Sequence, residues 1–181
     1  MRLPSRSVFA LVLSALALPA APPARAQEAG PRAFGDWTGL CLAGHCSLSA
    51  FADAQGPVAF RPEGPQPAYR LSLLRRAGSS WDDLIFTPVG GSVLPGSLIG
   101  LRIDATPVAR LDAADGWNPV EDGAPNEAIF APSISQADLL PRMRQGRALI
   151  VDFTGDDGRA RQARFSLSGL GAGEGWLANP R

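Results

Sequence analysis

Two cysteines and a histidine lie close together near the start of the chain, in the stretch FGDWTGLCLAGHC at residues 34–46. Cys41 and Cys46 are the only cysteines, and His45 is the only histidine. Residues of these types could form a redox pair, part of a zinc site, a nucleophile with its base, or a structural disulfide. The spacing discriminates between these four kinds of site.

The spacing favours a disulfide. A redox pair is typically C-x-x-C beside a βαβ unit, and a zinc site needs three or four ligands. His45 directly precedes Cys46, so their side chains diverge along an extended strand and are poorly placed as base and nucleophile. The four residues between Cys41 and Cys46 fit a bridge between the ends of two hairpin strands. Trp37 would share the cysteine face and pack over the sulfurs.

Paired carboxylates offer a second kind of chemistry. Adjacent acids occur at Asp82-Asp83, Glu121-Asp122 and Asp156-Asp157. Two carboxylates at the right separation could hydrolyse a glycan, although adjacent acids in turns are usually just solvated. The chain has no G-x-S-x-G elbow and no nucleotide-binding glycine motif, and it lacks lysine, which excludes Schiff-base chemistry. We therefore predict no catalytic residues, no cofactor and no metal.

Tryptophans and arginines are the candidates for contact with a partner. Trp81, Trp117 and Trp176 lie in loop-like surroundings, where a tryptophan is either a lid on the core or an exposed contact residue. We keep all three as candidate partner contacts, with both interpretations open. Five arginines could bind anionic groups or simply be solvated: Arg75, Arg76, Arg142, Arg144 and Arg147.

The N-terminal residues predict a secretory signal peptide. Arg2 and Arg6 precede an apolar run from Val8 to Leu18, and Ala24-Arg25-Ala26 forms an A-x-A cleavage site. This run is too short to span a bilayer, and no later segment is long enough. We expect cleavage after Ala26 and a soluble product that is periplasmic or secreted.

The length and net charge of residues 27–181 limit the number of domains and the classes of partner to be expected. They suit a single domain, with residues 27–33 as a flexible lead-in. Three of the 17 basic residues lie in the leader, so 14 remain against 17 acids, a net charge of −3. Nucleic acid is therefore not an expected partner, because phosphate binding needs concentrated positive charge.

Alternating apolar and polar residues predict short antiparallel strands with one solvated face. The alternation is clear in residues 46–51, 69–73 and 99–104. Residues 147–153 and 159–169 flank TGDDG, which predicts a hairpin with Asp157-Gly158 in its turn.

One segment is predicted to be helical, Ser133 to Gly146. Ser135 could cap it, and Pro141 should interrupt it, leaving two short turns. Residues 112–125 are predicted to be loop from their composition. The expected fold is a single all-β domain, an antiparallel β-sandwich-like structure with one short helical segment.

Four motifs in a fixed order carry a family resemblance: FGDWTGLC with a second cysteine, DDLIFTPVGGSVLPGSLIGLRID, LLPRMRQGRALIVDF and ARFSLSGL. In this order, the motifs resemble those of the invasion-associated locus B family, whose members are small exported bacterial proteins. The matching residues are Trp37, Cys41, Cys46, Arg102 to Asp104, Arg144 to Gly146, and Ser166 to Gly169. Family members commonly have a second cysteine pair where NEAIFAPSISQADLL stands here, so the chain resembles a divergent member.

The resemblance implies an exported all-β protein associated with host-cell entry or the envelope, without catalytic residues. We therefore expect a non-enzymatic envelope protein that binds another macromolecule through exposed tryptophans and a free sheet edge. Two alternatives are a glycan hydrolase that uses Asp or Glu, and a carrier of a small ligand. A concave site with a carboxyl of raised pKa would favour the hydrolase.

Overall fold

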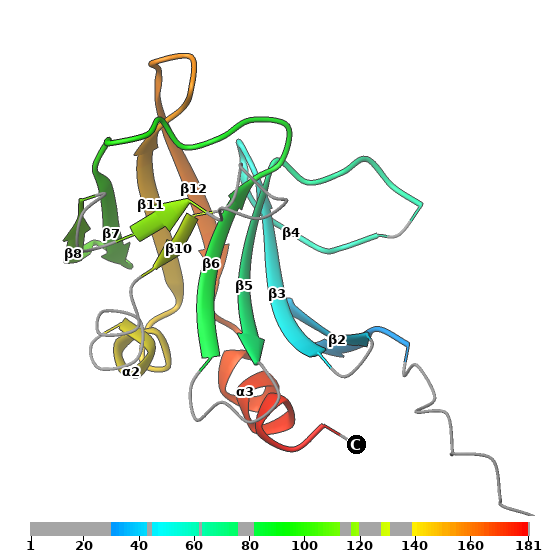
Figure 1. The fold of residues 1–181 in the computed structure, drawn as a ribbon. Coiled ribbons are helices and arrows are strands. Elements are labelled where there is room, and N and C mark those ends of the chain that lie inside the picture. Colours follow the sequence, from blue (N-terminus) through cyan, green and yellow to red (C-terminus); the bar gives the residue numbers. More distant parts are fainter. Residues whose placement is uncertain are drawn as a thin grey trace, which may run out of the picture.

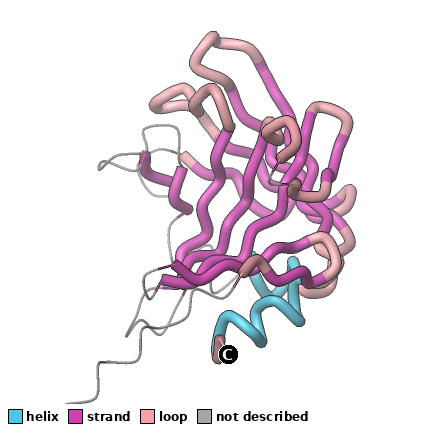
Figure 2. Tube along the Cα trace, turned by 90° about the vertical axis from the view of Figure 1, so that its right-hand side faces the viewer, coloured by secondary structure: helices cyan, strands magenta, loops and turns pink. Residues whose placement is uncertain are grey.

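The computed structural model describes residues 30–42, 45–61, 63–75, 82–112, 117–119, 128–130 and 139–180. These residues form two antiparallel sheets that face each other, with the helices at one end (Figures 1 and 2). The predicted signal peptide, its cleavage site and Trp81 lie outside the described residues.

The larger sheet has eight strands, seven of them in the order β1-β2-β3-β5-β6-β10-β9, with β4 paired to β3. The strands are β1 (Arg32–Phe34), β2 (Trp37–Leu42), β3 (His45–Asp53), β4 (Gly56–Val58), β5 (Tyr69–Arg75), β6 (Asp82–Pro88), β9 (Trp117–Pro119) and β10 (Ala128–Phe130). β9 lies within residues 112–125, so the prediction that this region is entirely loop is wrong. Three residues with weak strand character become a strand there because β10 supplies their hydrogen-bond partners.

The smaller sheet has the order β12-β11-β7-β8. Its strands are β7 (Ile99–Ile103), β8 (Thr106–Leu111), β11 (Ala148–Thr154) and β12 (Ala160–Ser166). β11 and β12 form the predicted hairpin, and Gly158 in its turn has a φ of 76°. That left-handed conformation is one that glycine adopts at little cost.

The core lies between the sheets, where the alternation of the sequence placed it. In β3 the side chains of Cys46, Leu48 and Ala50 are buried on the inner face, and Phe165 of β12 is buried opposite them. An aromatic cluster continues this core: the ring of Phe86 lies 5.0 Å from that of Phe153 and 6.1 Å from that of Phe165. Both sheets thus share one apolar core, and the prediction of an all-β, sandwich-like antiparallel fold is confirmed.

The helices differ from the prediction. α2 (Leu140–Met143) begins immediately before Pro141, which therefore lies in the first turn and does not interrupt the helix. Proline suits this position because the first amide groups of a helix need no intrahelical acceptor. The predicted cap Ser135 lies outside the described residues. A second helix, α3 (Leu170–Ala178), was not predicted, so the expectation of one helical segment is wrong.

The opening and closing motifs of the family resemblance are hydrogen-bonded to each other in the structure. The indole N–H of Trp37 donates to the Ser166 carbonyl at 3.0 Å, and the Asp36 amide donates to the Ser168 carbonyl at 3.1 Å. These bonds join the first hairpin of the larger sheet to the end of β12. In this structure, the opening and closing motifs therefore have a shared structural role.

Asp104, at the end of β7, connects the smaller sheet to the segment after α2 by hydrogen bonds. Its φ is 55°, the one positive value at a non-glycine position in the described part of the chain. Its Oδ1 accepts hydrogen bonds from the Arg147 amide at 3.1 Å and the Ala148 amide at 3.0 Å. An aspartate tolerates this left-handed conformation better than most residues, and here its carboxylate also caps the start of β11.

Candidate functional site

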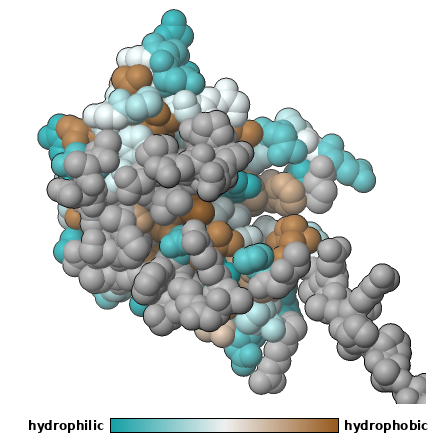
Figure 3. Space-filling view, in the orientation of Figure 1, coloured by the Kyte–Doolittle hydropathy of each residue, from teal (hydrophilic) through white to brown (hydrophobic). Residues whose placement is uncertain are grey.

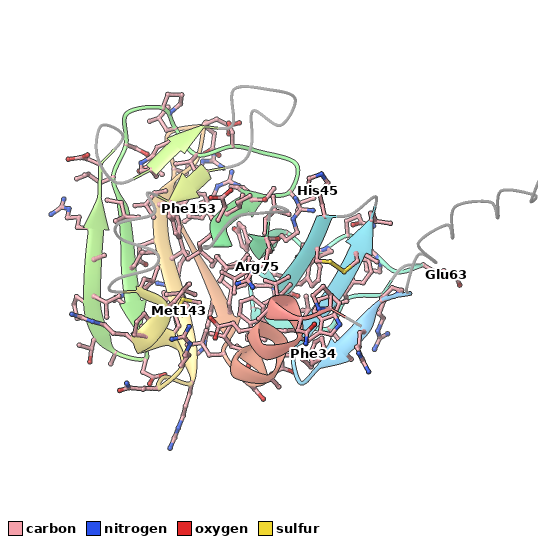
Figure 4. All side chains as sticks on the ribbon, turned by 60° about the horizontal axis from the view of Figure 1, so that its bottom comes forward. Phe34, His45, Glu63, Arg75, Met143 and Phe153 are labelled. Carbon is pink, nitrogen blue, oxygen red and sulfur yellow. A yellow bond between two sulfur atoms is a disulfide. The ribbon has the colours of Figure 1, made fainter. Side chains whose placement is uncertain are left out.

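Cys41 and Cys46 form the predicted disulfide. They lie directly opposite each other at the ends of β2 and β3, and their sulfurs are bonded (Figure 4). Neither sulfur is therefore available as a nucleophile or a thiolate ligand in this state. Within the described ranges, no three His, Cys, Asp or Glu side chains are grouped so that they could hold a metal ion.

Trp37 is fully buried on the cysteine side of β2, and a second tryptophan, Trp176, covers part of the same face. Trp176 of α3 covers Gly39, which stands between Trp37 and Cys41 on the strand. A Cβ at Gly39 would come within 2.5 Å of Trp176 Cζ3. The ring of Trp176 also lies 5.4 Å from that of Phe34.

The structure does not bring the candidate contact tryptophans together. Trp117 is 2% exposed, and its indole N–H donates to the Ser97 carbonyl at 3.1 Å. It is a core residue on β9, at one edge of the larger sheet, so the core-lid interpretation holds for Trp117. Trp176 is half-buried over β1 and β2, at the opposite edge.

Asp156 and Asp157, the adjacent acids that can both be described, are engaged in structural contacts. Asp157 in the β11–β12 turn accepts a hydrogen bond from Arg161 at 2.8 Å, which lowers its pKa. Asp156 accepts a hydrogen bond from the Ser92 hydroxyl at 3.1 Å, which holds the turn against the loop after β6. Glu121 and Asp122 lie outside the described residues, as does the side chain of Asp82.

A different surface, the outer face of the larger sheet, has the arrangement of a binding site. Antiparallel register aligns its outward side chains in rows across the strands. One row, from β2 to β6, contains Thr38, Ser49, Ser72 and Ile85. The hydroxyls of Ser49 and Ser72 are 2.8 Å apart and hydrogen-bonded, and both side chains are buried although they face away from the core.

Two more rows flank the hydroxyl row. One contains Leu40, Ser47 and Leu74, and continues to Asp83. The other contains Phe51, Arg70 and Thr87. An Nη2 of Arg70 donates to Thr87 Oγ1 at 3.4 Å. The face therefore combines a polar floor with apolar side chains.

The segment between β4 and β5 forms one wall over this face. Phe60 of this segment stacks on Phe51 of β3, with 4.9 Å between the ring centroids. Pro67 of the same segment also lines this face. Glu63, which lies between Phe60 and Pro67 in the chain, is the part of the segment farther from the sheets (Figure 4). In Figure 3 the molecule is hollowed on its right-hand side, below this segment, and apolar surface borders the hollow.

Two hollows on this face share Ser47, Ser49 and Arg70, so we treat them as one feature, the outer groove. The larger hollow has a volume of 320 Å³ and the smaller 210 Å³. The outer groove is defined by its described lining residues: Pro31, Thr38, Leu40, Ser47, Ser49, Phe51, Phe60, Gln66, Pro67, Arg70, Ser72, Leu74, Ile85 and Val89.

Arg70 is the one charged side chain among the described residues that line the outer groove. Asp83 continues a row of the face but lines neither hollow. The guanidinium of Arg70, which donates to Thr87, gives the floor of the outer groove a positive charge. Val89, on the apolar wall, is 40% exposed, so it adds apolar surface to the edge of the outer groove.

Sequence reasoning missed the outer groove for a physical reason. Ser47, Ser49 and Arg70 have the spacing of a solvated strand face, which is how the alternation was interpreted. One feature of the sequence could have indicated the groove. Phe51 shares the outward face with these polar positions, and an aromatic ring is not expected on a fully solvated face. Its partner, Phe60, belongs to a proline-rich segment whose path over the sheet is not encoded by local periodicity.

Comparison of the chain with models of protein families, with curated proteins and with solved structures returns no match. The resemblance to the invasion-associated locus B family therefore stays a prediction. Among the described residues, no helix has the length and apolar character needed to cross a bilayer, and the longest, α3, has nine residues.

Proposed function

We propose that this chain is an exported, non-enzymatic protein that acts by binding another macromolecule in the outer groove. The groove itself is the observation that carries the proposal. It places Phe51, Phe60 and Val89 beside a hydroxyl floor, on the sheet face that the protein's own core does not use. Open grooves with apolar walls and a few polar groups are a common means of recognising an extended partner.

Export is supported by two features. The N-terminal residues have the order of a secretory signal, from Arg2 through an apolar run to Ala26. The Cys41–Cys46 disulfide is of the kind that persists in an oxidising compartment outside the cytoplasm. The resemblance to invasion-associated locus B proteins adds the expectation of an envelope role or a role at the host cell.

A hydrolase receives less support from the described acids. Asp152 borders a separate hollow of 500 Å³ on the smaller sheet, where Arg102 donates to its carboxylate at 2.8 and 3.0 Å. These bonds lower the pKa of Asp152, so the carboxyl stays ionised. A glycosidase needs one carboxyl whose pKa is raised, so that it can donate a proton.

A photocrosslinking residue at position 60 tests the proposal. The chain, with its leader, is expressed in the organism that encodes it, with a benzophenone amino acid replacing either Phe60 or Arg164. Arg164 is exposed on the outer face of the smaller sheet and is the matched control. A partner that crosslinks from position 60 and not from position 164, and binds the purified chain more weakly after Phe51→Ala, supports the proposal. No crosslink from position 60, or equal crosslinking from both, overturns it.

A further inference from the structure

The floor of the outer groove is the face of a paired sheet and not one of its edges. It crosses four strands, from Thr38 on β2 to Ile85 on β6. Each of these strands is paired with its neighbours, so the backbone N–H and C=O groups are used within the sheet. An extended peptide that adds to a sheet as a further strand requires an unpaired edge. On this floor a ligand therefore meets side chains, and they decide what binds.

Hydroxyl groups supply the polar part of this floor. The side chains of Thr38 and Ser47 are half-buried in the groove, and within the described part of the chain no group is hydrogen-bonded to either hydroxyl. Ser49, between them on the face, is bonded to Ser72. A hydroxyl both donates and accepts, so its best complement is a ligand with many groups that do the same.

The spacing of these hydroxyls fits a sugar. Thr38 lies directly opposite Ser49, and Ser49 directly opposite Ser72. Neighbouring strands are about 4.8 Å apart, so hydroxyls recur at that interval across the floor. The hydroxyls around a pyranose ring are separated by similar distances. A hydrocarbon chain in the same place would leave the protein hydroxyls desolvated without partners, which is unfavourable.

The aromatic wall fits the other surface of a sugar ring. Phe51 and Phe60 stack at 4.9 Å, and both are half-buried, so part of each ring remains open to the groove. One face of a pyranose consists mainly of C–H groups, which pack well on the electron-rich face of an aromatic ring. Burial of this apolar surface would contribute to the association.

The part of the groove that combines these features is uncharged. Besides its hydroxyls, the larger hollow has the amide of Gln66 as a neutral polar group. The guanidinium of Arg70 donates to Thr87 on β6, which is on the opposite side of β5 from the hydroxyls of β2 and β3. The ligand that complements the β2 and β3 part of the floor is therefore uncharged as well.

The size of the groove suits a short stretch of a longer chain. Its two hollows have volumes of 320 and 210 Å³. Clefts that hold small ligands have volumes of about 300–1,000 Å³. Three strand spacings make the floor about 14 Å long, so several linked sugar rings can lie along it.

We infer that the outer groove binds an uncharged oligosaccharide segment, with a sugar ring on Phe51 and Phe60 and sugar hydroxyls on Thr38 and Ser47. This inference rests on the proposed function, because it names the chemistry of the partner in the same groove.

The test begins with the chain purified after export and an array of uncharged and anionic oligosaccharides of defined structure. The uncharged oligosaccharide that binds best is then titrated by calorimetry at low and at high ionic strength. Wild type is compared with Thr38→Val, Phe60→Ala and the control Thr106→Val. Thr106 is exposed on β8 of the smaller sheet, so the same substitution there removes a hydroxyl outside the groove.

We expect a group of structurally related, uncharged oligosaccharides to bind. Thr38→Val keeps the side-chain shape and removes one hydroxyl, so it should weaken binding by about fivefold. Phe60→Ala removes the stacking surface and should weaken binding by about tenfold or more. Thr106→Val should leave the affinity unchanged. The affinity should be equal at low and high salt, because no ion pair contributes to it.

Four results would overturn the inference: no oligosaccharide bound, binding of anionic oligosaccharides only, an affinity that falls steeply with salt, or equal affinity of wild type and Thr38→Val. The array and the salt comparison use the unaltered chain, so they remain decisive even if a variant does not fold.

The crosslink from position 60 separates this inference from the proposed function. Periodate cleaves the vicinal diols of sugars, so a crosslinked partner that periodate degrades supports the inference. A polypeptide partner overturns the sugar chemistry and leaves the proposed function standing. If no crosslink forms, the proposed function fails and the inference fails with it.

Discussion

Asp152 shows how single residues organise the outer face of the smaller sheet. Arg102 donates two hydrogen bonds to its carboxylate, and Gln162 donates a third at 2.8 Å. The Arg102 hydrogen bonds are the main cause of the lowered pKa of Asp152, and partial burial opposes them. The carboxylate is thus a structural anion in this face, and its charge contributes to stability in a pH-dependent way.

We predict that Asp152→Asn lowers the free energy of unfolding by roughly 0.5 kcal/mol at pH 7, because the pair is largely solvent-screened. The Asp152 side chain is 40% exposed. A carboxyl whose pKa is lowered by folding stabilises the protein above its unfolded pKa, about 3.9. This contribution disappears as the pH falls through the folded pKa. Urea unfolding of both proteins at pH 7 and at pH 3 or below should show the difference shrinking. A difference that stays constant with pH would contradict the assignment.

At the scale of elements, α3 covers part of the larger sheet's inner face at β1, β2 and β3, and its glycines make this contact close. A Cβ at Gly173 would lie 2.5 Å from Leu48 Cδ2. Gly175, on the solvent side of the same helix, has nothing within 4 Å of the corresponding position. The two glycines therefore allow a matched test of the packing.

Gly173→Ala should lower the free energy of unfolding by about 1–3 kcal/mol, because the methyl group cannot fit against Leu48 without moving the helix. Gly175→Ala should raise it by up to about 1 kcal/mol, since alanine favours helix and meets no neighbour. Chemical denaturation of the two variants provides the comparison. Equal effects of the two substitutions would mean that α3 does not pack on β3 as described.

The disulfide acts at the level of the β2–β3 hairpin. It closes a ring of Cys41, Cys46 and the four residues between them. We expect Cys41→Ser with Cys46→Ser to lower the free energy of unfolding by about 2 kcal/mol, the chain-entropy value for a ring this small. Below its melting temperature, the double variant should still crosslink its partner from position 60 as the wild type does. Loss of binding by the folded variant would show that the bridge has more than a stabilising role.

At the scale of the whole molecule, the two ends of the described chain are joined. The turn between β1 and β2 is bonded to residues 166–168, where β12 ends. Gly169 approaches the Phe34 carbonyl so closely that a side chain there would overlap it, and α3 then begins. The N-terminal strands and the C-terminal helix therefore complete the same layer of the core.

Export is also a property of the whole molecule. We predict that the chain expressed with its leader in an exporting bacterium is recovered outside the cytoplasm, beginning at Gln27. Ala26→Arg should block cleavage, because the signal peptidase site needs a small residue at that position. Intact-mass spectrometry of the exported protein and of this variant checks both statements. A cytoplasmic, uncleaved product from the unmodified leader would contradict the prediction.

The strand faces were predictable from local periodicity. Leu71 and Leu73, or Ile99 and Leu101, are two residues apart, and a strand places such residues on one side whatever its neighbours. The disulfide was predictable because its ring is short, and the β11–β12 hairpin because Asp157-Gly158 suits its turn. These features depend on residues close together in the chain.

Tertiary structure alone decided the features that join distant residues. α3 was missed because Gly171, Gly173 and Gly175 lower helix propensity, and only the contact with Leu48 explains the small residue at 173. Trp117 was ambiguous until β10 and the Ser97 carbonyl enclosed it. The outer groove requires Phe60, from the segment after β4, to stack on Phe51. Local residue patterns determined the strands, the bridge and the leader expected for export, whereas non-local packing determined which outward face became a groove.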